Sequence, residues 1–463
     1  MQKRANSIDI LRGLAVIMMT FSGMIPFDGA LPVWMYHAQE PPPTHDFNPN
    51  LAGLTWVDLV FPFFLFAMGA VIPFAVPSRL DTKGVKATMQ HTFLRTLKML
   101  VFAIVVWQFH PWRCESLGFY APIIGLLTYV GFFLAFAKLP KLTASNSLKI
   151  NILGWVLVVA AGIFITMSGK KINPSENDAI IRVLANINFV GIGVWILTRH
   201  NPTLRLGIAL IFLAQYVGGS TEGTWMRTIW LMNTPWNLNA LMLLKYMLIF
   251  IPGTLVGDIL ANDTKTEITK SNTNAASALL SFSLASGLTL TTLIGLLSRQ
   301  VEVSFVVILV TLTAIGSWIF LQKRPATERA LWTIGAVLLV AGYCAEPFQG
   351  GIKKDHATLS YFFVTSGLAT FWIWAFEILT AQTRSFLVEK IIAPIRLLGQ
   401  NALMAYAMAG FLIVPLMGLT HLSDVFISKE QVALLGTLKA VFITVSMVIL
   451  TAFFSKKKIF WKI

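Results

Sequence analysis

The residues best suited to chemistry lie in the first polar loop of the chain and just after it. The stretch MYHAQEPPPTHDFNPN, residues 35–50, contains His37 and His45 and no lysine or arginine. Asp58 follows in the apolar stretch GLTWVDLVFPFFLFAMG. An imidazole exchanges protons near neutral pH, and a neighbouring carboxylate fixes its tautomer and raises its basicity. The pattern therefore favours base catalysis by a loop histidine with Asp58, unless Asp58 only caps the start of a helix.

Other polar residues lie in or beside apolar segments, where a charge is costly unless it meets a partner or water. Asp9 and Arg12 share a helix face, and they form either an ion pair at the helix start or, through Arg12, a site for a phosphate-bearing donor. Asn401 either caps a late helix or lines a cavity. His356 belongs to a polar segment that could approach the loop histidines.

The composition limits the class of protein that can carry these residues. The chain has 463 residues, of which 56% are hydrophobic and 12% charged, and its mean hydropathy is +0.71. These values predict an all-α polytopic transmembrane helical bundle. We attribute the net charge of +15 to loops on the cytoplasmic side and expect no nucleic-acid partner. Two distant cysteines and the lack of a ligand motif such as HExxH predict no metal site.

Apolar runs long enough to cross about 30 Å of hydrocarbon predict about 12 to 14 helices. The runs lie near residues 8–28, 55–77, 93–111, 118–137, 148–168, 180–198, 204–220, 238–260, 275–297, 304–321, 331–347, 359–380, 399–420 and 433–454. We expect one transmembrane domain over residues 1–463, with an external histidine-bearing loop at 28–54 and inserted helices at 169–236.

The distribution of basic residues predicts the orientation of these helices. Lys3 and Arg4 place the N-terminus in the cytoplasm, and lysine and arginine then recur in alternate loops and in the C-terminal tail. Both termini are therefore expected to be cytoplasmic, and His37, His45 and His356 to be external. Two pairs of lysines, Lys170 with Lys171 and Lys353 with Lys354, are exceptions, because they fall in loops expected to be external. We expect the chain to be an integral protein of a bacterial inner membrane.

Several motifs resemble those of the heparan-alpha-glucosaminide N-acetyltransferase family of transmembrane acyltransferases. NSIDILRGLAVIMM and GLTWVDLVFPFFLFAMG resemble the start of that family's catalytic region. LSYFFVTSGLATF, PIRLLGQNALMAY and KKKIFWKI resemble its late segments, in the same order. The resemblance implies that acetyl-CoA binds from the cytoplasmic side and that its acetyl group reaches an amino sugar or glycan on the other face. It also implies a homodimer embedded in membrane lipid.

The resemblance also implies roles for individual residues. A catalytic histidine is expected shortly before the GLT motif, where His45 is the nearest candidate and His37, followed by alanine, is the competitor. We favour His45 as the base or acyl carrier, with Asp58 orienting it and Asn401 donating to the oxyanion. Arg12, with Asp9, would help to bind the donor.

The chain departs from that family at two places. Gly23 stands where the family has an asparagine, with Ser22 as the adjacent polar group, and IIGLLTYV replaces a Leu-Gln-Arg motif. Two other classes of function therefore stay open. The first is a proton-coupled transporter of a sugar or glycan fragment, and the second is a non-catalytic membrane subunit.

Overall fold

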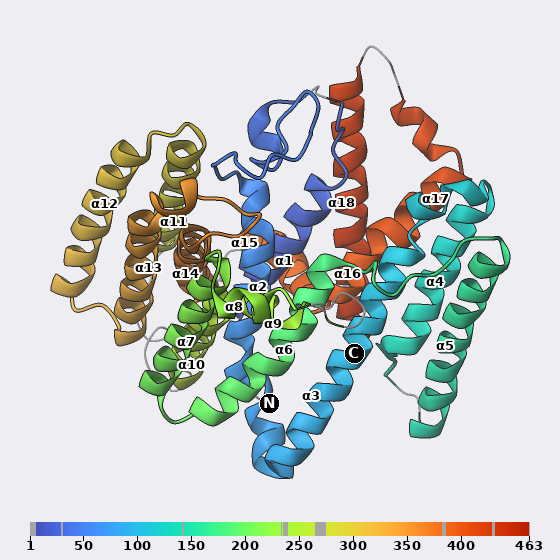
Figure 1. Cartoon of the computed structure of the whole chain (residues 1–463), viewed down its shortest axis with the longest axis horizontal. Helices are drawn as coiled ribbons and strands as arrows, with labels where there is room; N and C mark the ends of the chain where they lie inside the picture. Colours follow the sequence, from blue (N-terminus) through green and yellow to red (C-terminus); the bar gives the residue numbers. More distant parts are fainter. Residues whose placement is uncertain are drawn as a thin grey trace.

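The structure is a computed structural model that describes residues 6–28, 31–140, 143–232, 234, 239–263, 275–381, 386–427 and 431–462 (Figure 1). Lys3 and Arg4, on which the expected orientation partly rests, lie outside the described residues.

The described elements are almost all helices. The first half of the chain forms α1 (Asn6–Ser22), α2 (Trp56–Ala75), α3 (Pro77–Gln108), α4 (Tyr120–Phe136), α5 (Ala144–Met167), α6 (Ala179–Thr198), α7 (Pro202–Ser220), α8 (Trp225–Trp230), α9 (Ala240–Leu243) and α10 (Met247–Asp263). The second half forms α11 (Ala275–Leu297), α12 (Val301–Leu321), α13 (Ala326–Ala345), α14 (Leu359–Ala381), α15 (Phe386–Gly399), α16 (Ala402–Met408), α17 (Val414–Leu419) and α18 (Val432–Lys456). Two short strands, β1 (Ala137–Lys138) and β2 (Phe460–Trp461), pair antiparallel.

This architecture confirms the predicted all-α polytopic bundle. In the described part of the chain, 12 helices are long and apolar enough to cross a membrane. Helices α1 and α4, with 17 residues each, coincide with two further predicted runs. Every apolar run predicted from the sequence therefore falls on a helix or on consecutive helices, and the protein is an integral multi-pass membrane protein.

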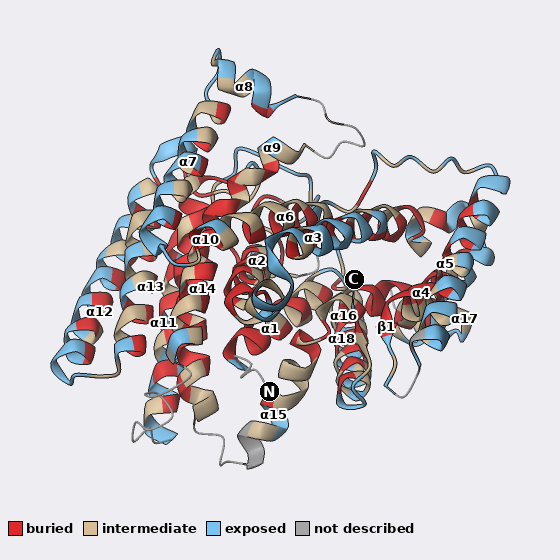
Figure 2. Ribbon diagram, turned by 90° about the horizontal axis from the view of Figure 1, so that it is seen from below, coloured by how far each residue is buried: buried red, intermediate tan, exposed pale blue. Residues whose placement is uncertain are grey.

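The centre of the bundle is formed by α1, α2, α10 and α14, whose residues are largely buried, whereas α5 and α12 expose apolar side chains at the periphery (Figure 2). Helices α2 and α10 approach each other closely at glycines, as is common for helices in membranes. A Cβ atom at Gly253 of α10 would lie 2.3 Å from the carbonyl oxygen of Phe66 in α2. Only glycine fits at this position, and α2 is thereby fixed against α10.

Segments that are distant in sequence meet at two ends of the bundle. At one end, the loop before α2 contacts the loop before α14, where the backbone N–H of Gly53 donates to the carbonyl of Ile352 at 2.9 Å. At the other end, the start of α1 packs against the end of α15, and the side chain of Asn401 binds β2. Figure 1 shows the loop before α2 at the top and the C-terminus below it. Helices α1 and α2 run between these two ends.

Candidate functional site

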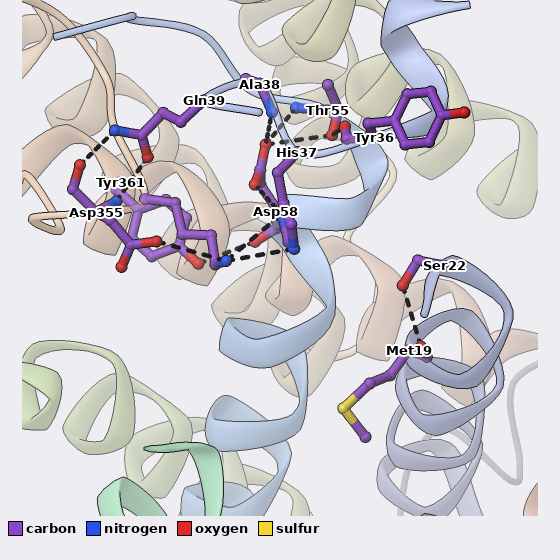
Figure 3. A network of polar contacts seen from close by, with 11 residues as sticks. Met19, Ser22, Tyr36, His37, Ala38, Gln39, Thr55, Asp58, Asp355 and Tyr361 are labelled. Atoms are coloured by element: carbon purple, nitrogen blue, oxygen red, sulfur yellow. Dashed lines mark hydrogen bonds and ion pairs between the residues drawn. The ribbon is translucent and has the colours of Figure 1, made fainter. Parts of the chain in front are cut away.

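Asp58 pairs with a histidine, as the sequence predicts, and the partner is His37 (Figure 3). Asp58 lies in the first turn of α2 and is 2% exposed. Its Oδ2 atom accepts from the backbone N–H groups of Thr55, at 2.9 Å, and Ala38, at 3.2 Å. Its Oδ1 atom lies 2.7 Å from Nδ1 of His37. Both interpretations of Asp58 therefore hold, because one oxygen caps the helix while the other orients an imidazole.

His45, which the sequence favoured, does not reach Asp58. Its ring packs against Tyr36, with ring centroids 4.3 Å apart, and against Phe27 at 5.3 Å. Its Nδ1 atom donates to the carbonyl of Glu40 at 3.1 Å. The expectation that Asp58 orients His45 was wrong. The loop folds back on itself, so that His45 packs against Tyr36 and Phe27 instead of reaching Asp58.

The loop before α14 holds the His37 loop in place. The side chain of Gln39 forms two hydrogen bonds with the backbone of Asp355: its amide nitrogen donates to the carbonyl, and its amide oxygen accepts from the N–H at 2.8 Å. In addition, the hydroxyl of Tyr361 in α14 donates to the carbonyl of Asp58 at 2.9 Å. His37 is thus positioned by two loops and two helices.

The same loop brings a lysine to His37, and sequence reasoning missed it. Nζ of Lys354 lies 3.4 Å from Nε2 and 3.5 Å from Nδ1 of His37. The sequence signal was weak: Lys353 and Lys354 formed one of two lysine pairs in loops predicted to be external, against the usual charge distribution. His356 was expected to approach the site, but it is exposed and does not line the cavity beside His37. Lys354 and Asp355 of the same loop line that cavity instead.

A cavity of about 270 Å³, called the His37 cavity, opens beside this pair. It is lined by Met19, Ser22, His37, Val57, Val60, Phe61, Ala179, Ile180, Val183, Tyr246, Lys354 and Asp355. Figure 3 shows Met19 and Ser22 of α1 across from His37. Helix α6, which the sequence marked as part of an insertion, supplies Ile180 and so belongs to the wall of the site.

A second cavity of about 170 Å³, called the arginine cavity, lies toward the start of α1. Its lining includes Arg12, Arg95, Asn401, Tyr406 and Trp461. The two cavities share Met19, Phe61 and Ile180. They are therefore neighbours, and their lining residues together extend from Arg12, near the start of α1, to His37.

Two arginines face the arginine cavity. Arg12 donates to Asp9 at 2.6 Å, so the predicted ion pair is present, and the Nε atom of Arg12 is buried without a hydrogen-bond partner. Arg95 of α3, which sequence reasoning missed, is exposed to the cavity, and no carboxylate among the described residues pairs with it. A guanidinium without a carboxylate partner suits a bound phosphate.

Asn401 lines the arginine cavity but does not lie beside His37 or Asp58. Its amide nitrogen donates to the carbonyl of Ile459, and its amide oxygen accepts from the N–H of Trp461, both at 3.0 Å. Both ends of the amide thus hold β2 against α16. The expected oxyanion role is corrected to a structural one, and the cavity-lining alternative holds.

A third cavity of about 240 Å³, lined by His110, Asp178 and Tyr406 among others, also touches Met19. Asp178 caps α6 by accepting from the N–H of Ile181 at 2.8 Å, and it accepts from the hydroxyl of Tyr406 at 2.5 Å. Burial lowers the pKa of His110 to about 4, so this imidazole is neutral at neutral pH. Among the described residues that line this cavity, Asp178 is the only aspartate, glutamate, lysine or arginine.

In the described part of the chain, no three His, Cys, Asp or Glu side chains come close enough to hold a metal ion.

The fold and these cavities define an integral multi-pass membrane protein with an internal His–Asp site. Over residues 4–260, more than half of its length, the chain matches the family described as a domain of unknown function, DUF5009, and it belongs to that family. The matched region contains Arg12, His37, Asp58 and Arg95. No match was found among curated proteins.

Proposed function

We propose that the protein is a transmembrane acyltransferase that moves an acetyl group from acetyl-CoA to the amine of an amino sugar or glycan. The observation that carries the proposal is the position of the His37–Asp58 pair at one end of two adjoining cavities whose other end contains Arg12 and Arg95. The motifs that resemble the heparan-alpha-glucosaminide N-acetyltransferase family support the same reaction.

The base in this reaction is Nε2 of His37. Asp58 accepts the Nδ1 proton at 2.7 Å, which fixes the tautomer and leaves the lone pair of Nε2 toward the cavity. Nε2 takes a proton from the acceptor ammonium, and the freed amine attacks the thioester carbonyl carbon. The C–N bond forms and the C–S bond breaks. Of the two protons that the ammonium loses, one passes from the imidazolium to the thiolate and the other goes to solvent. Asp58 stabilises the imidazolium throughout.

The donor binds in the arginine cavity. Arg12 and Arg95 are the cations that its phosphate groups would meet. The thioester end would then extend past Met19, Phe61 and Ile180 to His37. On this proposal, the end with Asn401 and β2 faces the cytoplasm, and the His37 loop faces the opposite side of a bacterial inner membrane.

The direct test incubates the detergent-purified protein with labelled acetyl-CoA and a panel of amino sugars. Mass spectrometry of the sugars and detection of free thiol measure the reaction. We expect an N-acetylated sugar and an equal amount of released thiol. Lack of both products in a folded preparation would contradict an acyltransferase function.

A proton-coupled transporter of a sugar or glycan fragment is a second candidate, because adjoining cavities and an internal His–Asp pair also suit proton relay. It predicts that sugar crosses the membrane of a proteoliposome chemically unchanged. The same sugar analysed by mass spectrometry on both sides of the vesicle distinguishes the two functions.

A further inference from the structure

We propose that Lys354 is itself an acyl acceptor: His37 deprotonates its side chain, and the acetyl group passes to Nζ when no amino sugar occupies the site. This inference rests on the proposed acetyl transfer. It assigns a covalent modification site, an N-acetylated lysine, to the loop before α14.

The position of Nζ carries the inference. It lies 3.4 Å from Nε2 of His37, the atom that Asp58 leaves free to accept a proton. The amine of an amino sugar must occupy the same neighbourhood to give its proton to the same base. Lys354 thus presents a primary amine where an external acceptor amine has to stand.

The cavity gives Lys354 access to the donor. Its side chain is 26% exposed and lines the His37 cavity, and its ammonium lies 3.6 Å from the carboxylate of Asp355. Asp355 is in turn fixed through its backbone by Gln39. A thioester carbonyl that reaches His37 past Met19 also reaches Nζ, because both residues line one cavity and the two nitrogens lie 3.4 Å apart.

The step is chemically balanced without any further reactant. The Lys354 ammonium gives one proton to Nε2 of His37, and the neutral Nζ attacks the thioester carbonyl carbon. The N–C bond forms and the C–S bond breaks. One of the two protons lost by the ammonium ends on the thiol and the other in solvent, which leaves acetyl-lysine and coenzyme A.

The adjacent lysine is a matched control. Lys353 has the same chemistry and the same sequence context, but its Nζ donates to the carbonyl of Gln349 at 3.0 Å in an exposed position. It does not line the His37 cavity. Acetylation that depends only on exposure and reagent would modify Lys353 at least as readily as Lys354.

The experiment incubates the full-length purified protein with deuterated acetyl-CoA and no acceptor, followed by chymotryptic digestion. Fragment ions assign the label to Lys353 or Lys354. We expect label on Lys354 well above that on Lys353, and no change in Lys353→Arg. His37→Ala should slow the labelling of Lys354 by about 10²-fold or more, because it removes the base. His37→Gln, which is closer in shape, is the second variant should His37→Ala not fold.

Equal labelling of the two lysines, or labelling of Lys354 that survives removal of His37, would overturn the inference. A saturating amino sugar measured in parallel separates the inference from the proposed function. Acetylated sugar in the reaction with amino sugar, together with unmodified Lys354 in the reaction without it, overturns the inference alone. Neither product in a folded preparation overturns both.

Discussion

At the scale of single residues, the site depends on how Asp58 divides its two oxygens between the start of α2 and His37. The sequence predicted an imidazole against Asp58, because a carboxylate so near a histidine-bearing loop needs a partner. It favoured His45 over His37, whereas the structure places His37 against Asp58. The choice depends on the path of the loop, in which His45 packs on Tyr36 and Phe27. That path is set by contacts with a loop some 300 residues away along the chain, such as Gln39 with Asp355.

The two loop histidines give the first prediction. His37→Ala should lower acetyl transfer by about 10²–10⁴-fold, the usual contribution of a general base, whereas His45→Ala should keep most of the activity. Steady-state rates of thiol release measure both variants. Equal losses in the two variants, with both proteins folded, would contradict the assignment of His37.

Asp58→Asn gives the second prediction. The amide oxygen of asparagine can still accept from the N–H of Thr55, so the start of α2 should survive. The charge that orients and stabilises the imidazolium is lost, and we expect kcat to fall by about 10²–10⁴-fold. Thermal unfolding of the same sample is the control, and a large drop in Tm would show that Asp58 acts mainly as a helix cap.

Arg95→Gln gives the third prediction, which concerns donor binding. Loss of one charged hydrogen bond, worth about 1.5–3 kcal/mol, should raise the KM for acetyl-CoA by about 10–100-fold and leave the KM for the sugar unchanged. Lys98→Gln, on the same helix but outside the arginine cavity, is the matched control. A similar KM for the donor in both variants would remove Arg95 from the donor site.

At the scale of elements, the helices were predictable and their packing was not. Runs of apolar residues give the position of each helix directly, because crossing the membrane requires length and apolarity. Which helices meet depends on side-chain surfaces that a single sequence does not reveal. The close contact of α2 with α10 at Gly253 is one example, and the contribution of α6 to the His37 cavity through Ile180 is another.

Gly253 gives a prediction at this scale. In Gly253→Ala, the new Cβ would lie 2.3 Å from the carbonyl of Phe66, which should separate α2 from α10 and destabilise the fold by about 1–3 kcal/mol. Gly287→Ala, in α11, meets nothing within 4 Å and should be neutral or slightly stabilising. Thermal unfolding in one detergent compares them. Equal Tm values would show that the two helices can move apart without cost.

At the scale of the whole molecule, the account rests on a path through the bundle. The sequence predicted that cationic groups and an imidazole lie at opposite ends, since Arg12 opens the first apolar segment and His37 follows its end. It could not show that the two cavities adjoin at Met19, nor that Lys354 would join His37. Both facts follow from the convergence of segments that are distant in sequence.

The measurement that tests this path most directly is acetyl transfer across a membrane. Proteoliposomes would hold labelled acetyl-CoA only on the side of β2 and an amino sugar only on the side of the His37 loop. Protease accessibility would determine the orientation of the protein in the vesicles. The account predicts acetylated sugar on the His37 side, with coenzyme A retained on the other side. Acetylated sugar that forms only when both substrates share one side, or sugar that crosses unchanged, would contradict it.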